Sequence, residues 1–211
     1  MINLLRDGAS QIGCPLSNTD IERFDVYYTH LVDWNKKTNL TGSQDAQALI
    51  VTLFLDSLAF SESLSKYNCS MSILDVGTGA GFPGLPLKIV NPMLDVTLVE
   101  PNLKKVAFLH HIIGTLDLTQ VTVFSQQIQT FGSEQLRHKK IDFVLSKALK
   151  CSSYLPYVHH LIHETSQIVL WRSSHLDPQQ DLHGFAIDRE ISYTLPFGFG
   201  ERNLSILTSK S

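Results

Sequence analysis

The chain has 211 residues, of which 43% are hydrophobic, and its formal net charge is −3. This length suits one α/β domain with an appendage. Because the net charge is weakly negative, the protein as a whole does not attract nucleic acid electrostatically. No apolar run of membrane-spanning length or secretory signal is evident, and the scattered Cys14, Cys69 and Cys151 argue against a disulfide framework or a metal knuckle. We therefore expect a cytoplasmic protein with no membrane or metal partner.

The first 66 residues have a helical pattern. Residues 17–20, Ser-Asn-Thr-Asp, are N-cap types, and apolar residues then recur at helical spacing up to a turn at 35–42. A further helical segment is expected from about Asp45 to Leu64. We expect residues 1–66 to form a helical cap and residues 67–211 to form a second domain. The aromatic residues of the first long helix are interpreted as packing residues, namely Phe24, Tyr27, Tyr28 and Trp34.

The remaining chain alternates between strand and helix patterns. Strands are predicted at 72–77, 95–100, 121–124, 141–146 and 167–171, with helices after Pro83 and at 102–115, 128–131 and 152–162. This order predicts an α/β, Rossmann-like fold with a mostly parallel sheet, and the runs at 191–195 and 204–208 predict an antiparallel C-terminal hairpin.

Ligands of such sheets bind at the carboxyl ends of the strands. The predicted strands end at residues that can hold or orient a ligand, and these should share one rim: Asp75, Glu100, Ile128–Gln129, Lys147 and Arg172. A carboxylate at the end of the second strand, here Glu100, can accept two hydrogen bonds from a ribose diol. The pattern therefore predicts a nucleoside site at this rim.

A glycine-rich loop follows the first predicted strand, and two motifs fit it. Residues 79–84 satisfy G-x-G-x-x-G, the dinucleotide fingerprint, whereas residues 75–81, Asp-Val-Gly-Thr-Gly-Ala-Gly, satisfy the D-x-G-x-G-x-G turn of S-adenosylmethionine enzymes. Asp75 suits an α-ammonium group better than a pyrophosphate, and Pro83 and Pro86 remove N–H donors that a phosphate would need. The loop favours S-adenosylmethionine over a dinucleotide.

Three stretches together resemble one family. They are Trp34-Asn-Lys-Lys-Thr-Asn-Leu-Thr41 followed by Leu55-Asp-Ser-Leu58, the glycine loop with its continuation Leu-Pro-Leu-Lys-Ile, and Gly200-Glu-Arg-Asn-Leu204. The chain resembles the RsmG (GidB) family of 16S ribosomal RNA guanine-N7 methyltransferases over nearly its entire length. The two prolines of the loop, unusual for a dinucleotide site, are ordinary in that family.

The resemblance implies particular site residues. Cofactor contacts fall on the loop, on the rim and on Lys147, at Asp75, Gly77, Thr78, Gly79, Gly81, Phe82, Glu100, Ile128 and Gln129. Glu100 would hold the ribose, and Ile128–Gln129 would flank the adenine. Lys147, in Ser-Lys-Ala where the family has Ser-Arg-Ala, and Arg172, near the family's Lys-Gly, would be catalytic. The implied partner is small-subunit ribosomal RNA or the 30S particle, bound by a monomer through a local basic patch.

Several positions differ from the family. Phe54 and Asn203 stand where His is frequent, and Gln127 and Gln129 stand where Arg and Glu are usual. Lys147 keeps the charge of the family's Arg but lacks the planar fork that suits guanine O6 and N7. These differences bear on the RNA target more than on the cofactor. They keep open a diverged methyltransferase for another RNA or a small molecule, and a non-catalytic RNA-binding module with a relic pocket; an NAD-dependent oxidoreductase ranks last.

The expected chemistry is simple for the protein. Guanine N7 carries a lone pair and no proton at neutral pH, so the enzyme must align N7, methyl carbon and sulfur in a dry pocket and needs no general base. Lys147 or Arg172 could donate to guanine O6; the alternative is that both are solvated strand-end cations. His159 and His163 lie four residues apart on the predicted helix, but without H-E-x-x-H they are interpreted as ordinary histidines. The lysine pair 104–105 could contact phosphate, as could Lys36, Lys37, Arg137, Lys139, Lys140, Lys150 and Arg202.

Overall fold

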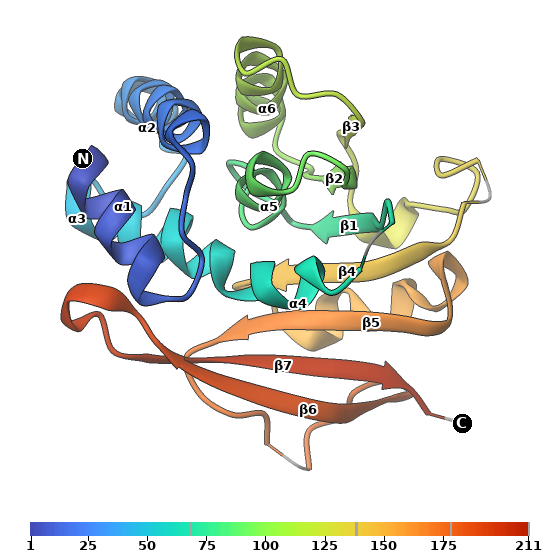
Figure 1. The fold of residues 1–211 in the computed structure, drawn as a ribbon. Coiled ribbons are helices and arrows are strands. Elements are labelled where there is room, and N and C mark those ends of the chain that lie inside the picture. The colour runs from blue at the N-terminus through green and yellow to red at the C-terminus, as the bar shows by residue number, and fades with distance from the viewer. Residues whose placement is uncertain (68, 138, 178, 211) are drawn as a thin grey trace.

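The protein is built on one seven-stranded sheet (Figure 1). The computed structural model describes residues 1–67, 69–137, 139–177 and 179–210. The strand order is β3-β2-β1-β4-β5-β7-β6. β1 to β5 are parallel, and β7 is antiparallel to both β5 and β6. The strands are β1 (Ser72–Val76), β2 (Asp95–Val99), β3 (Val121–Phe124), β4 (Ile141–Lys147), β5 (Ile162–Arg172), β6 (Phe185–Thr194) and β7 (Glu201–Ser209).

The two faces of the sheet are covered differently. On one face lie α5 (Gly84–Val90) and α6 (Leu103–Thr115), with the N-terminal helices beside them (Figure 1). On the other lie short 3₁₀ turns between β4 and β5. Alternate residues of β1 serve the two layers, since Ile73 belongs to the core of the helical face and Leu74 to the core of the other. The predicted Rossmann-like sheet with its antiparallel hairpin is confirmed.

The N-terminal region consists of α1 (Ile2–Gln11), α2 (Asn18–Thr38) and a broken helical run. A reciprocal capping box between Ser17 and Asp20 begins α2, and Asn39 in the left-handed conformation ends it. The run comprises α3 (Ala46–Leu49), the π-helical η1 (Ile50–Leu55), the 3₁₀ helix η2 (Leu58–Phe60) and α4 (Ser61–Ser65). Buried residues of this region share one core with the sheet, so the division at residue 66 stays a prediction.

The helix predicted at 152–162 is wrong. The segment forms three separate 3₁₀ turns, η4 (Cys151–Ser153), η5 (Leu155–Tyr157) and η6 (His159–Leu161), and β5 begins at Ile162, earlier than predicted. Pro156 lacks the N–H that a continuous helix needs. As a result His159 and His163 do not share a helix, and His163 lies in β5, where its Nε2 is 3.0 Å from Asp142 Oδ1.

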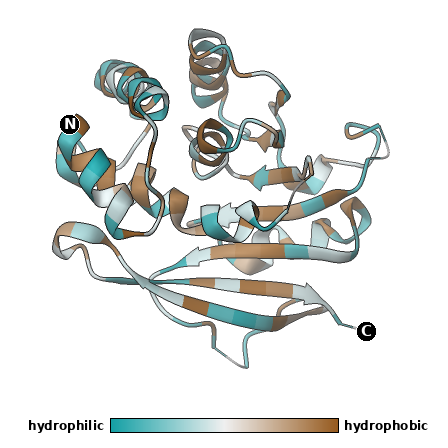
Figure 2. Cartoon of the chain, viewed as in Figure 1, coloured by the Kyte–Doolittle hydropathy of each residue, from teal (hydrophilic) through white to brown (hydrophobic). Residues whose placement is uncertain are grey.

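The sequence was expected to hold no apolar run of membrane-spanning length, but one stretch of the described chain, Ala46–Ser65, is long and apolar enough to cross a membrane by length and composition alone. In the fold, 56% of its most apolar window is buried inside the protein. Figure 2 shows that η1 and α5 are both largely hydrophobic, as expected for elements packed between the sheet and the other helices. The stretch is therefore weak evidence for a membrane span, because core helices have the same composition.

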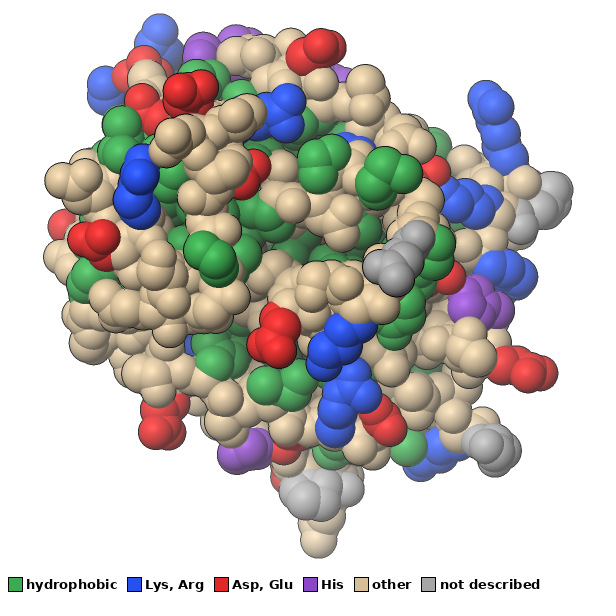
Figure 3. Space-filling view, viewed as in Figure 1, with side chains coloured by type: hydrophobic (Ala, Val, Ile, Leu, Met, Phe, Trp, Pro, Cys, Tyr) green, Lys and Arg blue, Asp and Glu red, His purple; other side chains and the backbone are tan. Residues whose placement is uncertain are grey.

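The surface charge is mixed on the face shown in Figure 3. Lys and Arg side chains gather there in small groups, separated by neutral and acidic side chains (Figure 3). This distribution agrees with the small net charge of −3. It leaves the local basic patch expected from the sequence as a prediction, to be judged from the residues around the site.

Candidate cofactor and substrate site

The loop after β1 makes a tight turn at the carboxyl edge of the sheet. Gly77, Gly79 and Gly81 have φ values of 66°, 63° and 101°, a region that side chains with a Cβ rarely adopt. Gly77 N–H donates to Val99 O at 2.8 Å, which fixes the start of the turn to the end of β2. The glycines were predicted from the motif, and the turn brings them beside the ends of β1 and β2.

Asp75 lies beneath this loop and is fully buried. Its Oδ2 accepts hydrogen bonds from Thr78 Oγ1 at 2.7 Å and from Gly84 N at 2.8 Å. Its Oδ1 is also buried and has no hydrogen-bond partner among the described residues. Burial raises the pKa of Asp75 from 3.8 to about 7, although the bonds from Thr78 and Gly84 oppose the rise. Asp75 thus holds the loop and keeps one oxygen free.

Glu100, at the end of β2, also contacts the loop. Its Oε2 accepts a hydrogen bond from Gly79 N at 2.9 Å, and its Oε1 accepts one from Asn102 N at 2.9 Å. The side chain is buried. Asn102 in turn caps α6 by accepting from the N–H groups of Lys104 and Lys105. The carboxylate therefore lies at the predicted place, in a frame made by the loop and the start of α6.

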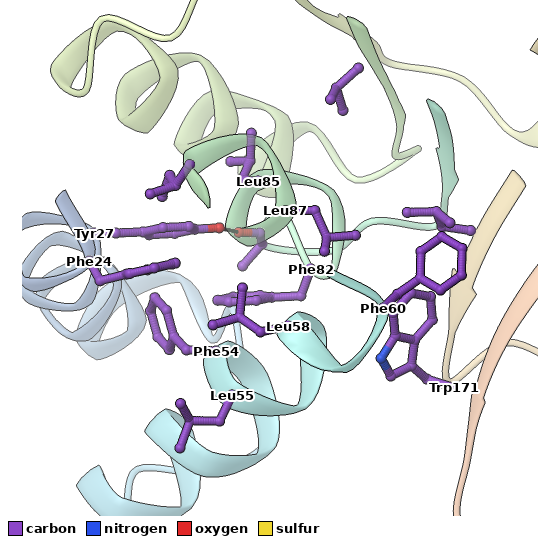
Figure 4. Packing of buried hydrophobic residues seen from close by; sticks show 14 of the residues in the cluster. Phe24, Tyr27, Phe54, Leu55, Leu58, Phe60, Phe82, Leu85, Leu87 and Trp171 are labelled. Carbon is purple, nitrogen blue, oxygen red and sulfur yellow. Dashed lines mark hydrogen bonds between the residues drawn. The ribbon is translucent and has the colours of Figure 1, made fainter. Parts of the chain in front are cut away.

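The N-terminal region reaches the loop through Tyr27 of α2. Its hydroxyl donates to Ala80 O at 2.5 Å, and its ring stacks on Phe82 with centroids 5.3 Å apart. Figure 4 shows both rings packed with Phe54, which meets Phe82 edge-on at 5.0 Å. The packing role predicted for Tyr27 is confirmed, but its hydrogen bond to the loop was not predicted. Phe82 itself is buried in this cluster, where the apolar Phe54 fits in place of the family's frequent His.

A groove of about 260 Å³ opens beside the loop, between the ends of β1, β2 and β3. Gly77, Ile128 and Gln129 line it, as the sequence predicted. Two further residues were missed. The Oε1 atom of Gln126 is buried and has no partner among the described residues, and the side chain of Leu149 lies so close to Gly77 that a Cβ there would be 2.5 Å from Leu149 Cδ1. No motif marked either residue.

A larger pocket of about 570 Å³ adjoins the groove, and Leu149 lines both. Lys147 and Arg172 both line it. Lys147 is mostly buried and is not a solvated strand end, because its Nζ lies 2.8 Å from Asp56 Oδ2 and donates to Thr52 O at 2.6 Å. Arg172 Nε donates to Ser174 O at 3.2 Å. The structure therefore brings the two predicted catalytic cations together and ties Lys147 to the N-terminal region.

Asp56 makes the contacts that join Lys147 and two further strands to the N-terminal region, and the sequence analysis did not predict these contacts. Tyr193 of β6 donates its hydroxyl to Asp56 Oδ1 at 2.5 Å, and Trp171 of β5 donates its indole N–H to the Asp56 carbonyl at 2.7 Å. Together with the ion pair from Lys147 of β4, residues of three strands thus bind one residue of the N-terminal region. Asp56 lies within the Leu-Asp-Ser-Leu motif, so the motif marked the residue but not its partners.

Six of the basic residues singled out in the sequence lie in three places. Lys150 and Arg202 line the large pocket with Arg172. Lys139 and Lys140 precede β4, at the amino-terminal ends of the parallel strands and away from the glycine loop. There Lys139 pairs with Asp95, and Lys140 donates to His160 O at 2.9 Å. Lys105 lies near the loop, with its Nζ 4.0 Å from the position of a Cβ on Gly79. Among the residues described, no cluster of three metal-binding side chains occurs.

The sheet, the loop and the carboxylates at the ends of β1 and β2 define the protein as a class I methyltransferase fold. Among solved structures, an S-adenosylmethionine-dependent methyltransferase from Aquifex aeolicus matches at TM-score 0.53 and 17% identity, covering 78% of this chain and 94% of that one. A mutant of MtNAS in complex with S-adenosylmethionine matches at TM-score 0.60 and 14% identity, covering 92% and 77%. At these identities the likeness shows the fold alone.

Sequence comparison gives the family. The model of GidB, rRNA small subunit methyltransferase G, matches residues 20–201. Ribosomal RNA small subunit methyltransferase G of Staphylococcus epidermidis is 34% identical over 99% of this chain and 90% of that protein. The one from Bacillus cereus is 32% identical over 94% and 86%. The chain belongs to the rRNA small subunit methyltransferase G family, and the resemblance read from its motifs is confirmed.

Proposed function

We propose that this protein transfers a methyl group from S-adenosylmethionine to N7 of a guanosine in small-subunit ribosomal RNA. The observation that carries the proposal is the pairing of two cavities that share the side chain of Leu149, one beside the glycine loop and one lined by cations. Such a pair can hold a nucleoside cofactor and a second nucleotide side by side. Ribosomal RNA as substrate also places the protein in the cytoplasm, and we propose that it acts there as a monomer.

The residues of the smaller groove, and the two carboxylates beneath the glycine loop that borders it, fit S-adenosylmethionine, which supplies a methyl group activated on a sulfonium. Asp75 Oδ1 is a buried oxygen that has no partner among the described residues, and it suits the α-ammonium group. Glu100 can accept from the ribose hydroxyls, at the cost of loosening its bonds to Gly79 or Asn102. Gln126, with its unpaired Oε1, and Ile128 flank the place for the adenine. Gly77, Gly79 and Gly81 let the backbone approach the ligand closely, and Thr78 between them holds Asp75 through its hydroxyl.

The larger pocket suits a nucleophile that needs no deprotonation. Among the described residues that line it, Asp56 is the only carboxylate, and its two oxygens already accept bonds from Lys147 and Tyr193. A free general base is therefore lacking where the second substrate would lie. Guanine N7 requires none, so alignment and exclusion of water are the work left to the protein. Lys147 or Arg172 would donate to guanine O6 and orient the base.

The test uses S-adenosylmethionine labelled in its methyl group. The purified protein would be given small subunits, and separately naked small-subunit RNA, that lack N7 methylation. Digestion to nucleosides should yield labelled 7-methylguanosine. Label in a different nucleoside would contradict the N7 assignment, and binding of the cofactor without any transfer would contradict the assigned substrate.

A second candidate is a related methyltransferase acting on another RNA. It is favoured by one observation, the burial of Lys147 against Asp56 and Thr52, which leaves this cation fewer free donors for a base than a solvent-exposed one would have. Offering total RNA of the host in the same labelling assay separates the two candidates, because only the second predicts label outside small-subunit RNA.

A further inference from the structure

Two buried hydroxyl groups lie on the wall of the larger pocket. Ser146, near the end of β4, is 3% exposed, and Tyr154, between η4 and η5, is fully buried. Within the described part of the chain, neither Ser146 Oγ nor Tyr154 OH has a hydrogen-bond partner. Ser146 lies close enough to Tyr154 to oppose the rise of its pKa, but their contact does not reach the geometry of a hydrogen bond. Among the described residues, both hydroxyls are therefore left without a hydrogen-bond partner.

Unpaired buried hydroxyls are costly, because each has lost its bonds to water without replacement. Another buried serine of this fold avoids that cost. Ser166, equally buried, donates to Ile141 O at 2.7 Å and accepts from His163 N at 2.8 Å. Burial also raises the pKa of Tyr154 far above its ordinary value, so the phenol keeps its proton and can donate. Among the described residues, the other buried side-chain oxygens without a partner are Asp75 Oδ1, beneath the glycine loop, and Gln126 Oε1, in the adjoining groove. These exceptions gather at the proposed site, which indicates groups that a ligand completes.

The charges around the pocket indicate what that ligand carries. Arg172, Arg202 and Lys150 lie on its walls, whereas the one carboxylate among its described lining residues, Asp56, is paired with Lys147. The excess positive charge favours an anion such as a phosphate. A volume of about 570 Å³ is within the range of small-molecule sites and exceeds what a phosphate alone needs.

We infer that the larger pocket binds a single extruded purine nucleotide of the RNA, with Ser146 and Tyr154 hydrogen-bonded to the edge of its base and Arg202 and Lys150 around its phosphate. This inference rests on the proposed function and deepens it. Ser146 and Tyr154 then determine which base is accepted, because a base that fails to satisfy both hydroxyls leaves them unpaired. Because Leu149 also lines the cofactor groove, the bound base lies next to the methyl donor.

The experiment measures binding of guanosine 5′-monophosphate to the full-length protein with S-adenosylhomocysteine present, so that the cofactor groove is filled. Tyr154→Phe and Ser146→Ala should each weaken this binding about threefold to tenfold, the effect of one lost neutral hydrogen bond. Neither should lower the melting temperature, because each removes an unpaired hydroxyl. Ser166→Ala, which removes a paired one, should lower it by about 2–4 °C. Tyr157→Phe, at an exposed tyrosine of the next turn, should change neither property.

The outcomes separate this inference from the proposed function. If Tyr154→Phe melts lower than the wild type, as Ser166→Ala does, or binds guanosine monophosphate equally well, the hydroxyls are structural and the inference is wrong. Equal affinity for uridine monophosphate, or for inorganic phosphate, also overturns it. If the wild type makes no 7-methylguanosine but the two variants still lose nucleotide binding, the proposed function fails and the pocket assignment stands. If the wild type and Tyr154→Phe methylate RNA equally well, only the pocket assignment fails.

Discussion

Asp75 combines a structural role in the glycine loop with the cofactor contact that we propose for it. It holds the loop through Thr78 and Gly84, yet burial raises its pKa to about 7. Since the folded-state pKa lies above the ordinary value of 3.8, the folded protein holds this proton more tightly than the unfolded chain. The contribution of Asp75 to stability is therefore present below about pH 4 and is lost as the pH rises to about 7.

The same pKa predicts how cofactor affinity depends on pH. The ammonium group of S-adenosylmethionine favours the ionised carboxylate, so below pH 7 binding must displace a proton from Asp75. Affinity should fall about tenfold from pH 8 to pH 6 and should be nearly constant above pH 8. Isothermal titration calorimetry over this range measures it.

Two controls make that prediction specific. 5′-Methylthioadenosine lacks the ammonium group, so its affinity should not vary with pH over this range. Asp75→Asn should remove the pH dependence for S-adenosylmethionine and lower its affinity at pH 8. A tenfold change that persists in Asp75→Asn would assign the titrating group elsewhere and refute a contact between Asp75 and the ammonium.

Gly81 lies where the loop packs against Tyr27 of α2. With φ at 101°, a Cβ would be strained, and it would also lie 2.4 Å from the Tyr27 oxygen and 2.6 Å from Leu85 Cδ1. Gly81→Ala should therefore lower the free energy of unfolding by about 1–3 kcal/mol and abolish cofactor binding. Thermal unfolding and calorimetry check the two effects.

Gly114 of α6 is the matched control, because a Cβ there meets no atom within 4 Å and its helical backbone suits alanine. Gly114→Ala should stabilise the protein by about 0.5–1 kcal/mol and leave cofactor affinity unchanged. If both alanine variants behave alike, the crowding between Gly81 and Tyr27 does not limit the loop.

At the scale of elements, β4, β5 and β6 are joined to the N-terminal region by an ion pair and two hydrogen bonds to Asp56. The ion pair of Asp56 with Lys147 is mostly buried, with side-chain exposures of 6% and 13%. Removing one partner of such a pair leaves an uncompensated charge. Lys147→Met should thus lower the free energy of unfolding by about 3–5 kcal/mol, measured by denaturant titration.

A second variant tests whether Lys147 also acts on the substrate. Adding Asp56→Asn to Lys147→Met should restore part of the stability, because the unpaired carboxylate is gone. Methyl transfer should stay low in the double variant if Lys147 orients the base. Recovery of transfer together with stability would show that Lys147 serves only to join the N-terminal region to the sheet.

These contacts also show what the sequence could and could not predict. Local patterns predicted the strands, the capped α2 and the glycine loop, because apolar alternation, N-cap residues and glycine spacing act over a few neighbouring positions. The turns at 151–161 were missed because their apolar residues have helical spacing, whereas Pro156 interrupts the backbone bonds. Asp56 and Tyr193 are 137 residues apart in the chain, and no pattern within one element predicts such a bond.

The site divides along the same line. Asp75, Glu100 and the glycines belong to a contiguous motif or to a strand end, so their gathering followed from the topology. Gln126 and Leu149 stand out only through an unpaired atom and a close approach in space. Lys147 was predicted at the correct rim, but its burial against Asp56 depends on how the N-terminal region packs on the sheet.

Across the entire protein, charge decides how RNA can be bound. A net charge of −3 gives little overall attraction, so we expect local cations, such as those beside the larger pocket, to make the contacts to phosphates. Arg202 lines this pocket, whereas Lys140 lies at the amino-terminal ends of the parallel strands, where its Nζ donates a hydrogen bond to His160 O. The two residues carry the same charge and differ in location.

Their alanine variants therefore show whether the RNA binds at the pocket or at the amino-terminal ends of the parallel strands. Arg202→Ala should reduce the slope of log affinity against log salt concentration by about 0.7 to 0.9, the effect of one lost phosphate contact, and Lys140→Ala should leave it unchanged. Fluorescence anisotropy with a labelled small-subunit RNA fragment, measured from low to moderate salt, gives both slopes. Equal reductions of the slope would mean that the RNA contacts both the pocket and the amino-terminal ends of the strands. A reduction in Lys140→Ala alone would show that the RNA binds away from the pocket.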